Sequence, residues 1–233
     1  MDDFFVNNLQ ANNLDRYVIR QAIFKFIGTS LPLMEGKLLD AGCGKMPYKD
    51  FILKNTKVTD YIGLDIENAL LYDQEITPDY TWNGEQMPFE SNQFNGCMAT
   101  EVLEHCPEPE VFLNEVARVL KPHGTFFFTV PFIWNLHEVP HDEYRYTPFS
   151  LERHLKRCGF QDIKLQATGG WHAAMAQMIG LWVRRAPMSN RKRSYLSRVV
   201  IPVIHFLLAK DRKYSVTFSE GQMITGLCGI AKV

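Results

Sequence analysis

The stretch from Lys37 to Lys45 reads Lys-Leu-Leu-Asp-Ala-Gly-Cys-Gly-Lys, and it constrains the fold of this chain more than any other stretch. An apolar run that leads into two glycines is typical of a buried strand that ends in a tight turn. Gly42 and Gly44 carry no Cβ, so a ligand can approach their backbone closely. At the carboxyl end of a parallel strand, such a turn forms one wall of a ligand crevice. On these residues alone, a plain strand-to-helix turn explains the pattern equally well.

An acid at the end of the next expected strand makes the glycine turn more informative. Residues 59–65 are expected to form that strand, and they end on Asp65. A carboxylate about 20 residues beyond the glycine turn can accept hydrogen bonds from both hydroxyls of a ribose. The combination therefore favours a ligand that contains a ribose.

Strand-like and helix-like segments alternate along the chain. Strands are expected at 37–42, 59–65, 79–83, 95–101, 125–131, 160–167 and about 223–232, and helices at 13–27 (capped by Asn13), 46–55, 108–120, 148–158 and 171–183. Such alternation implies right-handed crossovers and a mainly parallel sheet. We therefore predict an α/β fold with a Rossmann-like, doubly wound, seven-stranded sheet, whose last strand is antiparallel and follows a helical insertion.

The length of 233 residues predicts one domain, 1–233, with residues 1–30 as an N-terminal helical cover and 170–215 as a helical insertion or lid. The net charge of -1 gives no sign of a bulk attraction to nucleic acid. Five scattered cysteines without a Cys-x-x-Cys pair fit a reducing cytoplasm rather than a disulfide framework. We expect no signal peptide, and no apolar run reaches the roughly 18 residues of a spanning helix.

Five sequence blocks carry a resemblance to a known family. They are residues 39–44, 61–66, 87–94, 100–105 and 116–125. In this order they resemble the class I S-adenosylmethionine-dependent methyltransferases, over roughly residues 36–165. Two further segments, 42–48 and 141–150, resemble a branch found among bacterial surface-polysaccharide biosynthesis enzymes. The resemblance implies S-adenosyl-L-methionine as cofactor and methyl transfer to a hydroxyl of a sugar or a lipid-linked glycan precursor.

The same resemblance implies the residues that hold the cofactor. Asp40, Gly42 and Gly44 would line its methionine end. Thr100 and Glu101 would lie under this end, and His105 would lie beside it. Its ribose hydroxyls would bind Asp65, and its adenine would pack on Ile66 and be flanked by Gly84 and Glu85. One position departs from the family pattern, because Met46 stands where a third glycine is expected. That departure puts the shape of the first crossover in doubt.

A polar loop, residues 132–147, is expected to form the acceptor site, because it leaves the fifth strand on the same edge as the glycine turn. Holding two reactants in line supplies about 7–11 kcal/mol, more than the roughly 3–5 kcal/mol that a general base adds. Histidines titrate in the range that a base needs. The expected catalytic residues are His141, Asp142 and His137, with His105 as a further candidate, and the expected acceptor-binding residues are Tyr144, Arg145, Tyr146 and Trp171.

No metal site is expected from the sequence. His137 and His141 are spaced as two ligands on a helix would be, but Pro140 disfavours a helix between them. Displacement at an activated sulfonium methyl group also needs no metal.

Residues 184–209 join a basic segment without acids to an apolar run. One interpretation is a solvated face followed by a buried lid helix. The other is an interfacial anchor on anionic lipid head groups, with Trp171 and Trp182 at the boundary. The expected location is the cytoplasm, in the second interpretation at the inner face of the membrane.

Several alternatives stay open on the sequence alone. The acceptor can instead be another small molecule, such as a quinone-like or phenolic lipid. A non-catalytic cofactor-binding subunit or sensor fits the glycine turn and Asp65 as well. A nicotinamide dehydrogenase shares these features but leaves residues 101–105 and the loop 132–147 unexplained. No nucleic-acid partner is expected, and the oligomeric state is left open.

Overall fold

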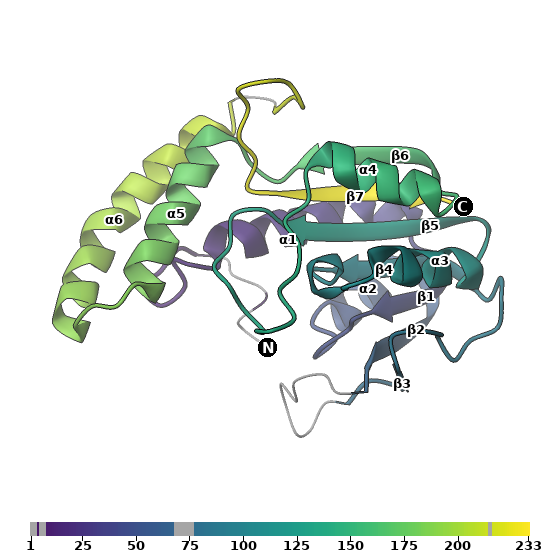
Figure 1. The fold of residues 1–233 in the computed structure, drawn as a ribbon. Coiled ribbons are helices and arrows are strands. Elements are labelled where there is room, and N and C mark those ends of the chain that lie inside the picture. The colour runs from purple at the N-terminus through teal and green to yellow at the C-terminus, as the bar shows by residue number, and fades with distance from the viewer. Residues whose placement is uncertain (1–3, 5–7, 68–76, 214–215) are drawn as a thin grey trace.

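The computed structural model describes residue 4 and residues 8–67, 77–213 and 216–233. Seven strands form one sheet in the order β3-β2-β1-β4-β5-β7-β6 (Figure 1). Their bounds are β1 Glu35–Ala41, β2 Lys57–Ile66, β3 Tyr80–Trp82, β4 Phe94–Thr100, β5 Leu120–Pro131, β6 Gln161–Ala167 and β7 Gly226–Lys232. Only β7 runs antiparallel to its neighbours among the described strand pairs. The predicted doubly wound sheet with an antiparallel last strand is confirmed.

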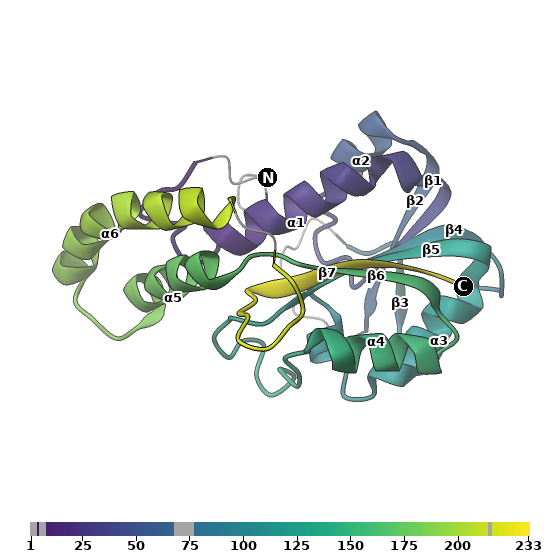
Figure 2. The ribbon, with the colours of Figure 1, turned by 90° about the horizontal axis from the view of Figure 1, so that it is seen from above.

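Helices cover both faces of the sheet, as Figure 2 shows from above. On one face lie α1 (Tyr17–Ser30) and α2 (Lys49–Asn55), and on the other lie α3 (Pro109–Val119) and α4 (Pro148–Arg157). Two short 3-10 helices span Leu31–Leu33 and Leu103–His105. The middle of β5, Phe126 to Phe128, is fully buried between the helical layers, as is usual for strands covered on both faces.

The start of the first helix differs from the prediction. The helix begins at Tyr17, and its N-cap residue makes no capping hydrogen bond with its side chain. Asn13 instead accepts a hydrogen bond from the Gln10 backbone N–H at 2.8 Å and donates its amide to the Asn8 carbonyl at 2.9 Å. The predicted cap at Asn13 is therefore wrong, because its side chain closes the turn before the helix.

Two helices lie between β6 and β7 and protrude beyond the sheet in Figure 1: α5 (Trp171–Arg185) and α6 (Asn190–Asp211). The insertion before the last strand is thus confirmed. Arg184 and Arg185 end α5, whereas the other arginines and the lysine of the basic segment and the whole apolar run lie in α6. Asp211 joins the two helices, since its carboxylate accepts hydrogen bonds from the backbone N–H groups of Gly170 and Ala173 at 3.1 and 3.0 Å. Within the described ranges, no helix has the length and apolar character needed to cross a bilayer.

The protruding helices are held to the domain by close packing against the segment that precedes α1. A Cβ atom at Gly180 would lie 2.0 Å from the Leu14 carbonyl oxygen, so α5 approaches the backbone of this segment as only glycine allows. Nearby, the Gln177 amide donates to the Asp15 carbonyl at 2.8 Å. The buried Asp15 carboxylate also pairs with Arg185 at 2.7 Å. Together these contacts fix the direction in which α5 leaves the sheet.

We expect the substitution Gly180→Ala to lower the free energy of unfolding by about 1–3 kcal/mol, because an extra methyl group overpacks this contact. The matched control is Gly28→Ala in α1, where a Cβ would meet no atom within 4 Å. It should stabilise the protein by about 0.4–1 kcal/mol. Urea unfolding followed by circular dichroism measures both. Equal stability of Gly180→Ala and the unaltered protein would contradict the close approach of α5 to Leu14.

Candidate functional site

The glycine turn ties the end of β1 to the end of β2. The backbone N–H groups of Gly42 and Cys43 both donate to the Leu64 carbonyl, at 2.8 and 3.1 Å. Gly42 has a φ of 78°, and a Cβ on it would lie 2.4 Å from the Val102 side chain. Glycine is required here because its backbone is left-handed and lies against the segment that follows β4.

Asp65 closes the turn from the other side. One oxygen of its carboxylate accepts the Gly44 N–H at 2.9 Å, and the other accepts its neighbour's N–H, that of Ile66, at 2.8 Å. Partial burial raises the pKa of this carboxyl above its ordinary value, and the two backbone hydrogen bonds oppose that rise. The acid predicted from the sequence thus lies directly beside the glycine turn.

Met46 takes the place of the third glycine of the family pattern and retains a left-handed backbone, with a φ of 48°. Such a conformation is uncommon for a residue with a side chain. Its sulfur packs against the backbone of Gly63, because a Cβ atom on Gly63 would lie only 2.7 Å from that sulfur. The helix α2 starts only at Lys49. The first crossover therefore begins with an irregular turn, as the departure from the pattern suggested.

Asp40 lies behind the turn and is almost completely buried, with 2% exposure. Its carboxylate accepts a hydrogen bond from the Tyr61 hydroxyl at 2.5 Å. Burial raises the pKa of Asp40 to about 7; the bond from Tyr61 opposes this rise and the charge of Asp65 adds to it. This carboxyl is therefore poised to change its charge when a cation arrives.

Ile66 and Gly84 mark the side of the site where the resemblance puts the adenine. Ile66 is 46% exposed, and its Cδ1 lies 3.5 Å from where a Cβ on Gly84 would stand. Asn83, which sequence analysis missed, accepts the backbone N–H groups of Glu85 and Gln86 at 3.0 and 3.3 Å. The Asn-Gly pair was the signal that could have identified this turn.

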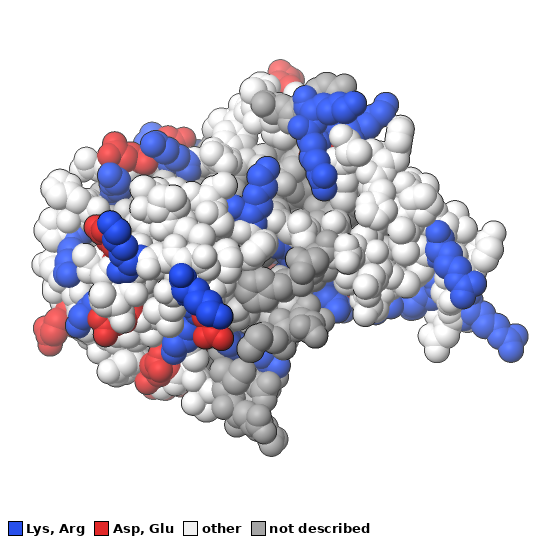
Figure 3. Space-filling model, turned by 180° about the vertical axis from the view of Figure 1, so that it is seen from behind, with Lys and Arg blue, Asp and Glu red and all other residues white. Residues whose placement is uncertain are grey.

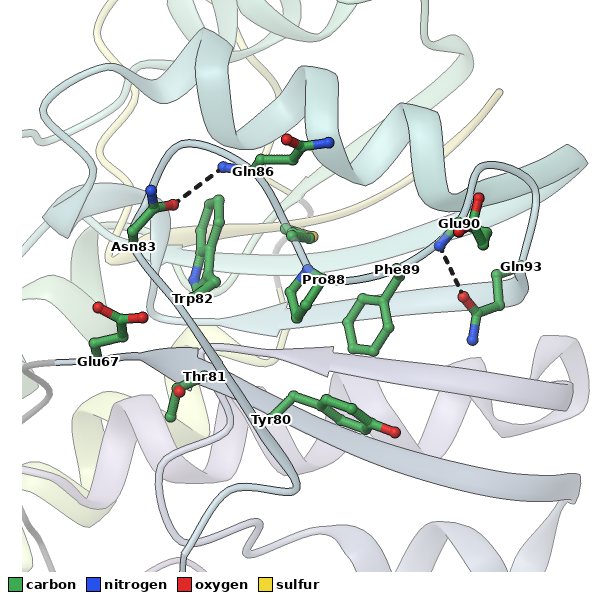
Figure 4. Close-up of a pocket in the computed structure, with 11 residues that line it drawn as sticks. Glu67, Tyr80, Thr81, Trp82, Asn83, Gln86, Pro88, Phe89, Glu90 and Gln93 are labelled. Atoms are coloured by element: carbon green, nitrogen blue, oxygen red, sulfur yellow. Dashed lines mark hydrogen bonds between the residues drawn. The ribbon is translucent and has the colours of Figure 1, made fainter.

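A hollow of about 610 Å³ adjoins this side and follows β3 and residues 83–93 (Figure 4). Its lining includes Glu67, Trp82 and Asn83, and no residue of the glycine turn. The hollow therefore extends the side of the site that carries Ile66 and Gly84 and does not reach the glycine turn.

Thr100 and Glu101 end β4 at the same edge of the sheet. Thr100 pairs with Thr129 of β5. Glu101 has a φ of 57° and accepts the Thr129 hydroxyl at 2.7 Å. Burial raises the pKa of the Glu101 carboxyl. With Asp40 and Asp65, Glu101 is thus the third acid with a raised pKa at the carboxyl ends of these strands.

The loop 132–147 folds back onto the segment that follows β4. The Glu104 carbonyl accepts backbone N–H groups from Glu143 and Tyr144 at 2.9 and 3.1 Å. His105 Nδ1 lies 2.8 Å from the His141 carbonyl oxygen. The rings of His105 and His137 meet edge to face, with centroids 4.7 Å apart. The predicted approach of this loop to the edge that bears the glycine turn is therefore seen in the structure.

The expected pairing of His141 with Asp142 is not formed. Both oxygens of Asp142 instead accept from Arg145, at 2.7 and 2.9 Å, and one lies 3.3 Å from His137 Nδ1. The guanidinium lowers the pKa of Asp142 to about 2, so this group stays ionised and is no proton acceptor near neutral pH. The side chain of His141 is exposed. The sequence alone does not indicate which neighbouring side chain binds Asp142.

The expected acceptor-binding residues are divided in the structure. Tyr146 is buried, and its hydroxyl donates to the Leu103 carbonyl at 3.0 Å, so it anchors the loop. Tyr144 stacks on it, with ring centroids 5.4 Å apart, and is 37% exposed. Trp171, half exposed at the start of α5, donates its ring N–H to the Gly221 carbonyl at 2.8 Å. Tyr144 and Trp171 are thus available to a ligand, whereas Tyr146 belongs to the core.

Comparison with known proteins agrees with this geometry. Residues 39–128 match the family described as a methyltransferase domain. A fatty-acid O-methyltransferase of Mycolicibacterium smegmatis is 24% identical over 52% of this chain and 45% of its own length. A ubiquinone biosynthesis O-methyltransferase of Coxiella burnetii is 24% identical over 48% of this chain and 51% of its own. The chain thus spans about half the length of these relatives.

The fold is also similar to that of solved structures. A methyltransferase of Archaeoglobus fulgidus that is S-adenosylmethionine-dependent matches with a TM-score of 0.57 and 16% identity, over 95% of this chain and 97% of its own. The strand order, the glycine turn and the family match all point the same way. Residues 39–128 are therefore similar to a methyltransferase domain, and the fold of the chain is similar to that of an S-adenosylmethionine-dependent methyltransferase.

Proposed function

We propose that the protein transfers a methyl group from S-adenosyl-L-methionine to a hydroxyl of a sugar or a lipid-linked glycan precursor. The observation that supports this most is the Asp65 carboxylate held against the Gly44 N–H at the end of two parallel strands. There it can accept ribose hydroxyls while the turn leaves room for the rest of the cofactor. The other cofactor contacts follow the assignments made from the resemblance, from Asp40 through His105.

Charge complementarity supports the proposed place of the methionine end. S-adenosyl-L-methionine carries a positive ammonium and a positive sulfonium. Asp40 is a buried acid at the end of β1, Glu101 is a partly buried acid after β4, and desolvation raises the pKa of each. A bound cation favours their ionised forms. These acids are thus ready to release protons as a cationic cofactor binds.

The loop 132–147 is the proposed acceptor site. His141, with an exposed side chain, is the proposed proton acceptor. Asp142 and His137 then serve the loop as positioning residues, because Asp142 binds Arg145 and contacts His137. Tyr144, Arg145 and Trp171 remain the proposed acceptor contacts. The helices α5 and α6 within residues 170–215 would close over this side as a lid, and residues 1–30 would cover the sheet.

A membrane surface is the proposed source of the acceptor, at the inner face of the cytoplasmic membrane. Residues 171–213 hold nine lysines and arginines and one acid. The rest of the chain holds 16 lysines and arginines and 25 acids. Figure 3 shows Lys and Arg but no Asp or Glu on the visible face of the two protruding helices. Such segregation of positive charge favours contact with anionic head groups.

Both protruding helices also expose an apolar stripe. On α5 it consists of Trp171, Met175, Met178 and Trp182, each between 49% and 53% exposed. On α6 it consists of Tyr195, Val199, Val203 and Phe206. Their spacing puts each set on one side of its helix. Apolar stripes beside basic side chains are typical of helices that lie in a membrane interface.

Two other functions remain candidates: methyl transfer to a different acceptor, and cofactor binding without catalysis. The similarity to O-methyltransferases described for fatty acids and ubiquinone favours a quinone-like or phenolic lipid as the acceptor. That acceptor would also come from a membrane. A non-catalytic cofactor-binding subunit or sensor is compatible with the glycine turn and Asp65. Radioactive methyl transfer from labelled S-adenosylmethionine to membrane extracts separates these possibilities, because a sensor would label nothing.

The cofactor site is tested by calorimetric titration with S-adenosylhomocysteine and, in parallel, with NAD⁺. We expect micromolar binding of the former only. Asp65→Asn should weaken it at least about tenfold, because one lost charged hydrogen bond costs about 1.5–3 kcal/mol. The matched control is Asp60→Asn, on the exposed part of β2. Binding of NAD⁺ alone by folded protein would overturn the methyltransferase proposal.

Cofactor affinity should depend on pH in a defined direction. Burial raises the pKa of the Asp40 carboxyl to about 7, so protons compete with the cofactor's ammonium group below that pH. The dissociation constant of S-adenosylhomocysteine should be constant above about pH 7.5 and rise below about pH 6.5, approaching tenfold per pH unit. Asp40→Asn should flatten this profile. A flat profile for the unaltered protein would mean that Asp40 does not sense the ligand.

Membrane binding is tested by flotation with phosphatidylglycerol vesicles, with phosphatidylcholine vesicles for comparison. The combined change Arg191→Glu, Lys192→Glu and Arg198→Glu should weaken flotation about 100-fold or more, since each basic residue near the surface contributes about 1 kcal/mol. The control pair is Lys54→Glu with Lys57→Glu, at the opposite edge of the sheet. Equal recovery on both kinds of vesicle, or none on either, would overturn the proposed anionic membrane contact.

A further inference from the structure

One carboxyl group beside the candidate site is buried without a hydrogen bond to any described residue. The Glu104 side chain is fully buried, and neither of its oxygens forms a hydrogen bond within the described part of the chain. Leaving such a group unsatisfied costs about 1–3 kcal/mol, and more when it is charged. Buried acids are normally hydrogen-bonded, paired or bound to a metal ion. Hydrogen bonds within the described part of the chain therefore do not explain why this acid is buried.

Two histidines surround this carboxyl group. Glu104, His105 and His137 each offer one ligand atom, and the three atoms lie within 4.8 Å of one another. His105 Nε2 is 3.8 Å from a Glu104 oxygen and 3.7 Å from an oxygen of Glu138. The cluster joins the segment after β4 to the loop after β5, so both sides of the site contribute to it.

The contacts behind the two histidines favour the tautomer that a metal ion requires. A carbonyl oxygen can only accept a hydrogen bond, so His105 carries its proton on Nδ1, which faces the His141 carbonyl. This leaves a lone pair on Nε2, the atom that lies near Glu104. His137 Nδ1 lies 3.3 Å from the Asp142 carboxylate, which favours the same tautomer. Metal-binding histidines commonly hold a carbonyl or carboxylate on the other ring nitrogen in this way.

We infer that Glu104, His105 and His137 form a binding site for one divalent metal ion, with Glu138 next to the fourth coordination position. A carboxylate with two imidazoles suits ions such as Zn²⁺ and Mn²⁺. The sequence-based expectation of no metal considered only His137 and His141. It missed this set because Glu104 and His105 lie more than thirty positions away in the sequence from His137.

The ion has a role that rests on the proposed function. His105 adjoins the proposed methionine end of the cofactor, so an acceptor hydroxyl near the cluster can bind the metal through its oxygen. Coordination lowers the pKa of a bound hydroxyl group and fixes its direction of attack. In that case His137 is a ligand of the metal, and the acceptor proton leaves to His141 or to solvent.

The test is calorimetric titration of chelator-treated protein with ZnCl₂ and, separately, with MnCl₂. We expect equimolar binding of at least one of these ions. Glu104→Gln and His137→Gln should each weaken it at least tenfold, the lower end of the about 10–100-fold that even residues behind the ligands contribute. The control is His154→Gln. His154 lies on α4, and its Nδ1 is 3.1 Å from a carboxylate oxygen of Glu110.

Each outcome supports or overturns the inference. Circular dichroism establishes that the variants fold, and His105→Gln replaces any variant that does not. If Glu104 is simply a protonated buried acid, Glu104→Gln will leave metal affinity and stability unchanged, which overturns the site. S-adenosylhomocysteine is titrated into the same samples. Binding of this compound without metal binding would overturn the metal inference alone, and metal binding without it would overturn the proposed methyl transfer alone.

Discussion

The rest of the site depends on the hydrogen bonds that the Asp65 carboxylate accepts. It accepts backbone N–H groups on two sides, from Gly44 in the turn after β1 and from Ile66 at the end of β2. These bonds hold the two strand ends together at the edge of the sheet. Because the carboxylate is fixed by backbone rather than by side chains, its position follows from the strand pairing itself. An acid placed in this way, which we propose binds the ribose, loses little conformational entropy when a ligand arrives.

A second constraint acts at the end of β4. The segment 101–105 leaves the sheet with a left-handed residue, Glu101, and then buries Glu104. The loop after β5 closes over it through hydrogen bonds from Glu143 and Tyr144 to the Glu104 carbonyl. Unfavourable features are thus concentrated in one place, where several acids are buried together. Sites that bind charged ligands commonly accept such local costs, which the rest of the fold offsets.

The sequence predicted those features that depend on local pattern. The mainly parallel, doubly wound sheet followed from the alternation of strand-like and helix-like segments. The neighbourhood of Gly42, Gly44 and Asp65 followed from parallel pairing. Contacts between loops were not predictable in the same way. Asp142 had His141, Arg145 and His137 within reach along the chain, and only the folded loop shows that it binds Arg145 and contacts His137. The choice depends on side-chain directions that periodicity does not encode.

The protruding helices illustrate the same limit with a different cause. Their basic residues and apolar runs were visible in the sequence, but whether the apolar side chains were buried was not. The structure buries one side of each helix against residues 9–18 and leaves a second stripe exposed on each. Each helix is therefore apolar on two sides, of which the domain covers one. A buried lid alone would need only the covered side, so the exposed stripes, next to basic side chains, argue for a surface that lies outside the chain.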